Sequence, residues 1–413
     1  MPAYQPKVEW DKEEVQSILD AVAREGAQRM LISALDQEIE EFLGRARYER
    51  QPGRRRRGYR NGVGKARKIA VGCGTLEIRP PRVRDTKEPF RSQLLPRYRR
   101  SSESIRALLP ELYLQGLATG DFEPALRTFL GEAAPLSPAS IVRLKEQWRA
   151  EYEAWKRRPL AARYAYCYAD GLYLKAGPED EKTAVLVVIG VTDDGQKELL
   201  TMVEGYRESR ESWRDVLRDL RRRGLTTVRL FVGDGGLGLW AAVEEIYPAA
   251  RHQLCWCHKM LNVLDKLPQR LQGEAKSLLR DIYTAPTRED AEERIGNFAQ
   301  RFEREYPRAV ASLVDRQAEL LTYYDFPREH WKSLRTSNPI ESIFDPVRLR
   351  TNATRRMRKA QTGLYLVFQL VRRAERRWRR IDAPHLVIKV LEGVPFTNGI
   401  EVIAKRSKRG VAA

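Results

Sequence analysis

The sequence predicts an α/β fold for the second half of the chain, because strand-like and helix-like segments follow one another there in a definite order. Three strand runs come first, at Tyr164–Lys175, Thr183–Thr192 and Lys197–Tyr206, separated by turn residues such as Asp193-Asp194-Gly195. A helix at 209–223, a strand at 228–232, a helix near 237–247 and a short strand at 250–254 follow. The order β-β-β-α-β-α-β is that of an RNase H-like core.

Three acidic residues fit this topology. The first and fourth strands of such a core are neighbours in the sheet, so Asp170 and Asp234 should meet although they are far apart in sequence. Glu341 follows only after a gap that is too long for a simple connection. Because residues 259–335 have helical patterns, we predict an all-helical insertion ahead of Glu341.

The first half of the chain is predicted to be mainly helical, with one small β-hairpin. Apolar residues recur at helical spacing over 11–45, and Gly44 ends the pattern. Residues 51–68 combine glycine, proline and many basic residues, which is typical of a solvated loop or of a segment that lies on phosphate. Residues 69–84 alternate apolar and polar side chains around a Gly-Cys-Gly turn, which indicates a short β-hairpin.

Residues 103–150 are a candidate helix-turn-helix. Ser137 and Pro138 form a favourable helix start, with serine as the N-cap and proline in the first turn. The helix that follows would turn Ser140, Arg143 and Lys145 outward, and such a helix can enter a major groove. An ordinary helical bundle is an equal alternative.

These segments give the following predicted organisation. It comprises an N-terminal helical and basic segment at 1–68, a β-hairpin and basic linker at 69–100, a helix-turn-helix-like domain at 101–158, the first part of the core at 159–258, a helical insertion at 259–335, the final core helix with Glu341 at 336–380, and a C-terminal tail at 381–413.

Composition predicts a polyanionic partner. Lysine and arginine number 75 against 56 acidic residues, for a net charge of +19, so the simplest partner is DNA or RNA held by counterion release. No apolar run approaches the roughly 20 residues of a spanning helix, which disfavours a membrane. The N-terminus carries no signal-peptide pattern, and four cysteines are too few for a disulfide framework, so a reducing cytoplasm is expected.

Basic residues gather in three places that we expect to contact nucleic acid. The candidates are Arg54, Arg55, Arg56, Arg57, Arg60 and Lys65 near the N-terminus, Arg143 and Lys145 in the helix-turn-helix candidate, and Arg348, Arg350, Arg355 and Arg356 after Glu341. The predicted fold is therefore an RNase H-like core with a helical insertion, preceded by mainly helical DNA-binding segments.

Acids collected in so basic a chain indicate Mg²⁺ chemistry on a phosphate backbone. Each acid also has a structural explanation. Asp170 and Asp234 are flanked by glycines that suit turns, and Glu341 stands where a capping-box glutamate belongs, behind Asn338 and Pro339. The catalytic interpretation therefore depends on their joint placement.

His252, Cys255, Cys257 and His258 cluster in RHQLCWCHKM. Four ligands within seven residues cannot readily surround one tetrahedral zinc ion, so a structural or site-supporting role is favoured over zinc. Acyl-transfer hydrolysis is disfavoured, since the chain has four histidines and no serine or cysteine nucleophile elbow.

Four motifs carry a resemblance to a known family. They are YADGLYLK, VGDGGLGLWAAVEEIYP, RHQLCWCHKMLNVLDKLP and YDFPREHWKSLRTSNPIESIFDPVRLRT. Together they resemble the mutator-type insertion-sequence transposases of bacteria, and the similarity runs over nearly the whole chain. The N-terminal half keeps the same order, with GYRNG, IRPPRVRD and LYLQGLATGDF.

The resemblance implies a DDE transposase whose metal-binding triad is Asp170, Asp234 and Glu341, with two Mg²⁺ or Mn²⁺ ions per active site. Cys255 and His258 match the family's C-x-x-H element. The implied reaction is nicking at the 3′ ends of the element, followed by attack of the freed 3′-hydroxyl on DNA. Asp345-Pro346 departs from the usual pattern after the glutamate.

The implied partners are double-stranded DNA, as element terminal inverted repeats and as target, and further copies of the chain in a homodimer or larger assembly. The expected location is the bacterial cytoplasm, at the nucleoid when DNA is bound. Trp331 is a candidate for stacking a displaced base, and a core tryptophan is the alternative. The competing functions are a catalytically inactive DNA-binding regulator and a structure-selective RNase H-like nuclease.

Overall fold

The computed structural model describes residues 12–49, 57–114, 130, 138–175, 182–205, 209–341, 344 and 360–402. The chain divides into two compact units, residues 1–144 and 145–413. The division lies within helix α4 (Pro138–Lys156), inside the range 101–158 that the sequence predicts as one domain. The described part of helix α4 starts at Pro138, and its predicted N-cap, Ser137, lies outside the described residues.

The first unit is built on one long helix and two small antiparallel sheets. Its elements are α1 (Lys12–Leu43), β1 (Tyr59–Val63), β2 (Arg67–Val71), β3 (Gly74–Ile78), β4 (Pro81–Arg84) and α2 (Glu103–Leu114). The predicted first helix is confirmed, and Gly44 ends it with a φ of 66°, which glycine adopts at little cost. The predicted hairpin is also confirmed as β2–β3. Its inner side chains pack with α1 in a small core of Leu35, Ile69, Leu76, Ile78 and Leu95.

The prediction of a loop over 51–68 is wrong for its second half, where strand β1 pairs antiparallel with β4. Arg60 lies in β1, and its guanidinium bonds to Asp36 at 2.6 Å and Glu40 at 3.0 Å on α1. The basic composition of this segment gave no strand signal. The strand is stabilised by its partner strand and by acidic residues on a distant helix. Residues 50–56 lie outside the described residues.

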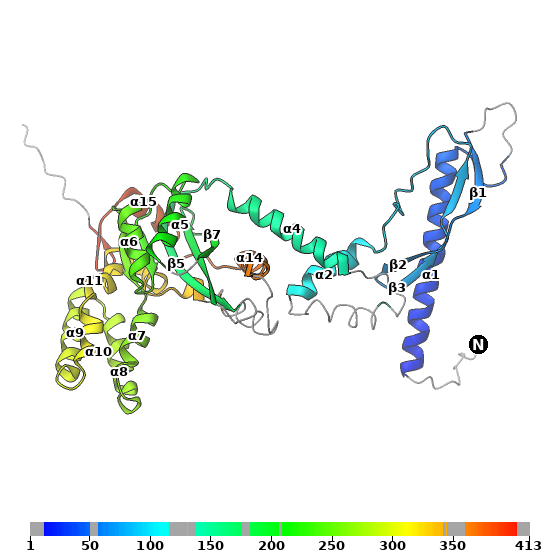
Figure 1. Cartoon of the computed structure of the whole chain (residues 1–413). Helices are drawn as coiled ribbons and strands as arrows, with labels where there is room; N and C mark the ends of the chain where they lie inside the picture. Colours follow the sequence, from blue (N-terminus) through cyan, green and yellow to red (C-terminus); the bar gives the residue numbers. More distant parts are fainter. Residues whose placement is uncertain are drawn as a thin grey trace, which may run out of the picture. The chain divides into compact units, whose positions relative to one another are not determined.

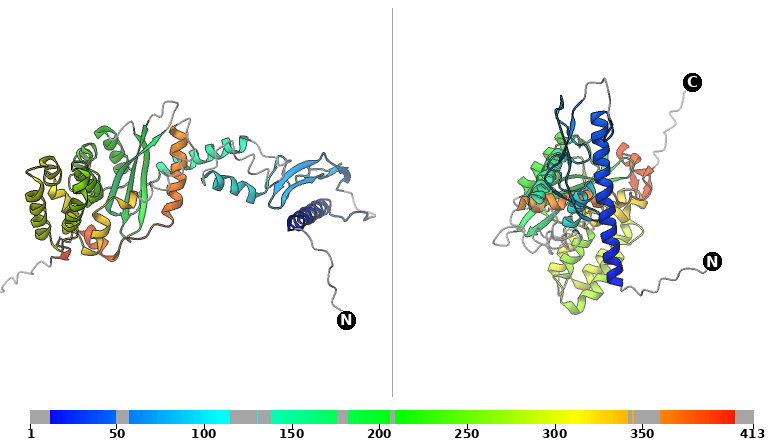
Figure 2. Two further views of the ribbon diagram at one scale, coloured as in Figure 1. Left: turned by 90° about the horizontal axis from the view of Figure 1, so that it is seen from below. Right: turned by 90° about the vertical axis from the view of Figure 1, so that its right-hand side faces the viewer.

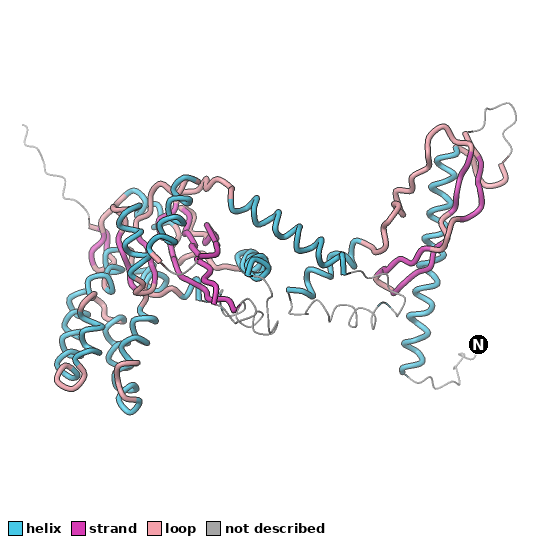
Figure 3. Tube along the Cα trace, in the orientation of Figure 1, coloured by secondary structure: helices cyan, strands magenta, loops and turns pink. Residues whose placement is uncertain are grey.

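The second unit contains one mixed five-stranded sheet. Its strands are β5 (Tyr164–Lys175), β6 (Lys182–Thr192), β7 (Lys197–Gly205), β8 (Leu230–Gly233) and β9 (Arg251–Leu254). They lie in the order β7-β6-β5-β8-β9, with the first three antiparallel and β8 and β9 parallel to β5. Figure 1 labels β5 and β7, and Figure 3 draws the strands in magenta. The predicted contact between the first and fourth strands is therefore confirmed.

Helices cover both faces of this sheet (Figure 2). Helices α5 (Arg210–Arg222) and α6 (Leu237–Ile246) lie on one face, and α14 (Ala360–Glu375) lies on the other. The end of α4 packs beside α14, since the rings of Trp155 and Phe368 are 4.8 Å apart. It is also bonded to β7, because the Tyr152 hydroxyl donates to the Met202 carbonyl at 2.8 Å. Burial on both faces explains the nearly continuous apolar runs of β5 and β6.

The chain between β9 and Glu341 is helical. It comprises α7 (Trp256–Leu264), α8 (Gln269–Tyr283), α9 (Arg288–Phe302), α10 (Pro307–Val314), α11 (Gln317–Leu320), η1 (Thr322–Asp325), η2 (Arg328–His330) and α12 (Trp331–Leu334). In Figure 1, α7 to α10 gather as a cluster at one end of the sheet. Within the described ranges, no helix combines the length and the apolar character that a bilayer crossing requires.

The buried side chain of Gln253 joins this helical segment to the sheet. Its amide oxygen accepts from the Tyr323 backbone at 2.8 Å, and its amide nitrogen donates to the Leu320 carbonyl at 3.0 Å. The indole of Trp256 donates to the same carbonyl at 2.9 Å. The start of α7 is thus held against the edge of the sheet.

The prediction of a C-terminal tail at 381–413 is wrong for residues 381–402. Helix α15 (His385–Glu392) and the short hairpin of β10 (Phe396–Thr397) and β11 (Ile400–Glu401) pack into the second unit. Gly399 has a φ of 81° and lies so close to Trp331 that a Cβ would stand 2.8 Å from its ring. About half of these residues are apolar, and the order of the stretch comes from their contacts with distant elements.

Candidate active site

Strands β8 and β9 end beside the middle of β5, and the three strands run parallel there. Ala169 pairs with Gly233 in the register of β5 and β8, so Asp170 and Asp234 follow at adjacent positions on neighbouring strands. The backbone N–H of Cys255, directly after β9, donates to the Gly233 carbonyl at 2.8 Å. The carboxyl ends of parallel strands are where α/β proteins place functional side chains.

Local hydrogen bonds fix the two aspartates. Asp170 is 8% exposed, and its Oδ1 accepts from the Gly171 backbone N–H at 2.8 Å. The Asp234 Oδ1 accepts from the N–H of Gly236 at 2.9 Å, and the Trp240 indole donates to the Asp234 carbonyl at 2.9 Å. The turn composition around Asp234 therefore sets the direction of its carboxylate.

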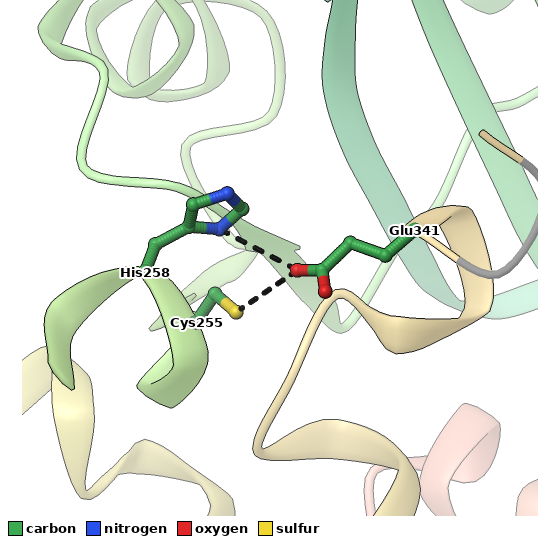
Figure 4. Close-up of side chains that lie close together, drawn as sticks. All are labelled: Cys255, His258 and Glu341. Atoms are coloured by element: carbon green, nitrogen blue, oxygen red, sulfur yellow. Dashed lines mark hydrogen bonds and ion pairs between the residues drawn. The ribbon is translucent and has the colours of Figure 1, made fainter. Parts of the chain in front are cut away.

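Glu341 reaches the same region from the other end of the helical segment. The N–H of Trp256 donates to the Arg335 carbonyl at 2.9 Å, which ties the chain before Glu341 to the start of α7. Residues 338–341 are helical. The Glu341 Oε1 lies 3.7 Å from His258 Nδ1 and 3.9 Å from Cys255 Sγ (Figure 4).

Ser337 stands between these groups and was missed by the sequence analysis. Its hydroxyl donates to Glu341 Oε1 at 2.8 Å, and its backbone N–H donates to Cys255 Sγ at 3.2 Å. Its carbonyl accepts from the Glu341 N–H at 3.1 Å, so Ser337 takes the cap position that the sequence analysis gave to Asn338. A serine directly before a helix is a common cap, and that signal could have identified it.

The capping-box alternative for Glu341 does not hold in this arrangement. A capping-box glutamate accepts from the backbone N–H of the cap residue. Here that N–H, on Ser337, points to the Cys255 sulfur, and the Glu341 carboxylate accepts from the Ser337 hydroxyl instead. The carboxylate is therefore directed toward the β9–α7 junction.

The site is strongly charged. A hydrogen bond from Cys257, followed by bonds from His258 and Ser337, lowers the pKa of Cys255 to about 3 against its burial. The bond with Cys255, with smaller contributions from the charges of Asp170 and Glu341, raises the pKa of His258 to about 9. These shifts favour an ionised Cys255 sulfur beside a protonated His258 ring.

Two kinds of ligand meet at Glu341. The atoms Cys255 Sγ, His258 Nδ1 and Glu341 Oε1 lie within 4.8 Å of one another. Sulfur and imidazole suit softer cations, whereas the oxygens of Asp170, Asp234 and Glu341 suit Mg²⁺ or Mn²⁺. The three carboxylates therefore fit the expected divalent ions by donor chemistry.

Trp331, the candidate for base stacking, is buried. It is 5% exposed, its indole donates to the Phe326 carbonyl at 2.9 Å, and its ring meets Tyr323 and Tyr324 edge to face. In this conformation the ring offers no open face to a base, and its surroundings support the core alternative.

The predicted DNA-contacting residues fall into three groups. Arg57, Lys65 and Arg143 are exposed, and Lys145 is half-buried. Arg60 is engaged with two acids of α1, so its role in the described structure is a structural one. Seven candidates lie outside the described residues, namely Arg54, Arg55, Arg56, Arg348, Arg350, Arg355 and Arg356.

Comparison with known proteins gives a consistent result. Residues 5–381 match the family model described as "Transposase, Mutator family". The transposase for insertion sequence element IS6120 of Mycolicibacterium smegmatis is 46% identical over 293 residues, which are 71% of this chain and 91% of that protein. The transposase for element IST2 of Acidithiobacillus ferrooxidans is 44% identical over 283 residues, which are 67% of this chain and 95% of that protein.

Among solved structures, the Drosophila P element transposase strand transfer complex matches 70% of this chain and 85% of its own chain at 10% identity. Its TM-score of 0.28 is too low to support an argument about the fold.

Proposed function

Since the chain belongs to the Mutator family of transposases, we propose that it is a DDE transposase in which Asp170, Asp234 and Glu341 hold divalent metal ions. One observation carries this proposal. The register of β5 and β8 makes Asp170 and Asp234 neighbours, and Glu341 reaches the same edge through Ser337 and the start of α7.

The strand order supports an RNase H-like core. Three antiparallel strands followed by two parallel ones, in the order β7-β6-β5-β8-β9, agree with the topology expected from the sequence. The helices between β9 and Glu341 support the idea of an all-helical insertion that brings the glutamate back to the sheet.

The charges around the edge support cation binding. Cys255, Asp170 and Glu341 all raise the pKa of His258, and Asp234 follows the residue that pairs with Ala169, so acidic groups outnumber the one histidine. Two divalent ions bound by the carboxylates would stabilise the charge that develops on the attacking and leaving oxygens. The chain's own contribution is to hold the three carboxylates from separate elements in fixed directions.

The proposed reaction needs no covalent bond to the protein. Water attacks the phosphorus at each 3′ end of the element, breaks its bond to the 3′ oxygen, and leaves a 3′-hydroxyl on the element. That hydroxyl then attacks a phosphodiester of the target, forms the new bond, and releases the target's own 3′-hydroxyl. The acids position the reacting groups, while exposed basic residues such as Arg57, Lys65 and Arg143 hold the DNA backbone.

The proposed partners follow from the reaction. Two element ends must be joined to one target, which favours a dimer or larger assembly on double-stranded DNA. The net charge of +19 supplies nonspecific attraction to that DNA. We place the activity in the bacterial cytoplasm, where the element's DNA lies.

The test compares the wild-type chain with Asp234→Asn on a labelled duplex that carries an end of the chain's own element. We expect Asp234→Asn to abolish Mg²⁺-dependent nicking and to leave duplex binding nearly unchanged. Undiminished nicking by the variant would remove Asp234 from the site. Binding without nicking by the wild-type chain would favour the inactive regulator, and equal nicking of duplexes without element ends would favour the structure-selective nuclease.

A further inference from the structure

The hydroxyl of Ser337 makes the shortest side-chain contact to the Glu341 carboxylate among the described residues, and we infer that Ser337 is a positioning residue for this carboxylate, held in place by Cys255. The inference rests on the proposed role of Glu341 as a metal ligand. Ser337 is fully buried, and its hydroxyl lies 2.8 Å from Glu341 Oε1.

Glu341 needs such a contact because its own position constrains it weakly. Its side chain is 33% exposed. A glutamate side chain has several rotatable bonds, and fixing them in one conformation lowers its conformational entropy. A bonding partner is needed to offset that loss. A bond to a buried hydroxyl selects one orientation of the carboxylate before any ligand arrives.

The contacts on Glu341 all fall on one oxygen. Ser337, His258 and Cys255 approach Oε1, and both dashed lines in Figure 4 end on that atom. Among the described residues, the second oxygen makes no hydrogen bond or ion pair. One oxygen is thus held by the protein, and the second remains available to a ligand.

Ser337 is itself anchored to the strand that carries Asp234. Its backbone N–H donates to Cys255 Sγ at 3.2 Å, and its hydroxyl oxygen lies 3.2 Å from the same sulfur. The Cys255 N–H donates in turn to the Gly233 carbonyl at 2.8 Å. A chain of contacts thus runs from Glu341 through Ser337 and Cys255 to the residue before Asp234.

The single hydroxyl proton of Ser337 can serve one acceptor at a time. Glu341 Oε1 is the nearer of the two, at 2.8 Å against 3.2 Å for the sulfur. The backbone N–H of Ser337 satisfies the sulfur independently. Cys255 therefore orients Ser337, and Ser337 orients Glu341, which gives this cysteine a role that needs no zinc.

The experiment compares Ser337→Ala with Thr336→Val. Both remove a buried hydroxyl, but the Thr336 hydroxyl has no hydrogen-bond partner among the described residues. The readouts are Mn²⁺ affinity of the DNA-free chain by electron paramagnetic resonance, the Mg²⁺ concentration that gives half-maximal nicking, and the unfolding temperature. A purely structural role would lower the unfolding temperature without moving the metal requirement of the folded protein.

We expect Ser337→Ala to weaken Mn²⁺ binding and to raise the half-maximal Mg²⁺ concentration by about tenfold or more, as loss of a bond to a charged group implies. Thr336→Val should leave both at the wild-type value. An unchanged metal requirement in folded Ser337→Ala would overturn the inference. If Ser337→Ala does not fold, Cys255→Ala takes its place, with a smaller rise in the metal requirement expected and an unchanged value contradicting the inference.

Two further outcomes separate this inference from the function on which it rests. If Asp234→Asn still nicks DNA, the proposed triad fails. If Asp234→Asn is inactive while Ser337→Ala keeps the wild-type metal requirement, only the positioning role fails. Stoichiometric zinc in the purified wild-type chain, lost in Cys255→Ala, would also overturn the inference, because Cys255, His258 and Glu341 would then share one ion.

Discussion

Gly233 allows the two proposed metal-binding aspartates to lie side by side, and Gly233→Ala tests this directly. Gly233 pairs with Ala169 at the position immediately before Asp170 and Asp234. A Cβ at Gly233 would stand 2.7 Å from a methyl group of Leu239 and 3.1 Å from the Ala169 carbonyl oxygen. Leu239 is buried, and the carbonyl belongs to the neighbouring strand, so the added methyl must push β8 away from β5.

The size of the effect follows from this crowding. Overpacking of a well-packed interior typically lowers the free energy of unfolding by about 1–3 kcal/mol. For a unit of this size each kcal/mol lowers the unfolding temperature by about 2–4 °C. The displacement of β8 also moves Asp234 relative to Asp170, and a misplacement of about 1 Å in a catalytic group can lower the rate on the order of a hundredfold.

Gly235→Ala is the matched control, because it changes the residue on the other side of Asp234. No atom lies within 4 Å of a Cβ at Gly235. This variant should unfold at or slightly above the wild-type temperature, since alanine restricts the unfolded chain. Thermal unfolding and Mn²⁺ affinity are measured for both variants. Wild-type behaviour of Gly233→Ala, or equal losses in both variants, would refute the account of this strand pair.

The remaining predictions concern stability and binding. Trp331→Ala should lower the free energy of unfolding by about 3–5 kcal/mol, because it empties a buried ring site; a normal unfolding temperature combined with lost nicking would instead favour base stacking. Burial lowers the pKa of His330, whose ring bonds to the Tyr166 hydroxyl at 2.7 Å and the Ala383 carbonyl at 3.2 Å. The folded protein favours the neutral ring, so its full contribution to stability is present above the unfolded pKa of about 6.5 and is lost as the pH falls below that value. The unfolding temperature should therefore drop between pH 7.5 and pH 5.5, and the drop should be smaller in His330→Gln. Binding of an element-end duplex should weaken steeply between 50 and 200 mM salt, as expected for many phosphate contacts, and a flat response in a filter-binding assay would count against a basic DNA-binding surface.

The sequence predicted most of the sheet because strands buried on both faces leave a strong local signal. The apolar runs of β5, β6 and β8 are bounded by turn residues, and their order limited the topology to one in which β5 and β8 are neighbours. The adjacency of Asp170 and Asp234 followed from that topology. The helices after β9 were also visible, since their apolar faces recur at helical spacing.

Elements that depend on distant partners were not visible. Strand β1 is stabilised by β4 and by acids of α1, and residues 381–402 are ordered by contacts with the helical segment around Trp331. Ser337 was overlooked in part for the same reason. It contacts the Cys255 sulfur, which comes from a remote part of the chain, and the Glu341 carboxylate, which is only four residues away.

The most direct test of the central claim is anomalous diffraction from Mn²⁺-soaked crystals of the chain bound to an element-end duplex. The account predicts Mn²⁺ peaks with carboxylate oxygens of Asp170, Asp234 and Glu341 as ligands, next to the phosphate at the 3′ end. A single peak on Cys255 and His258 that excludes Asp234, or a Glu341 carboxylate directed away from both aspartates, would contradict it.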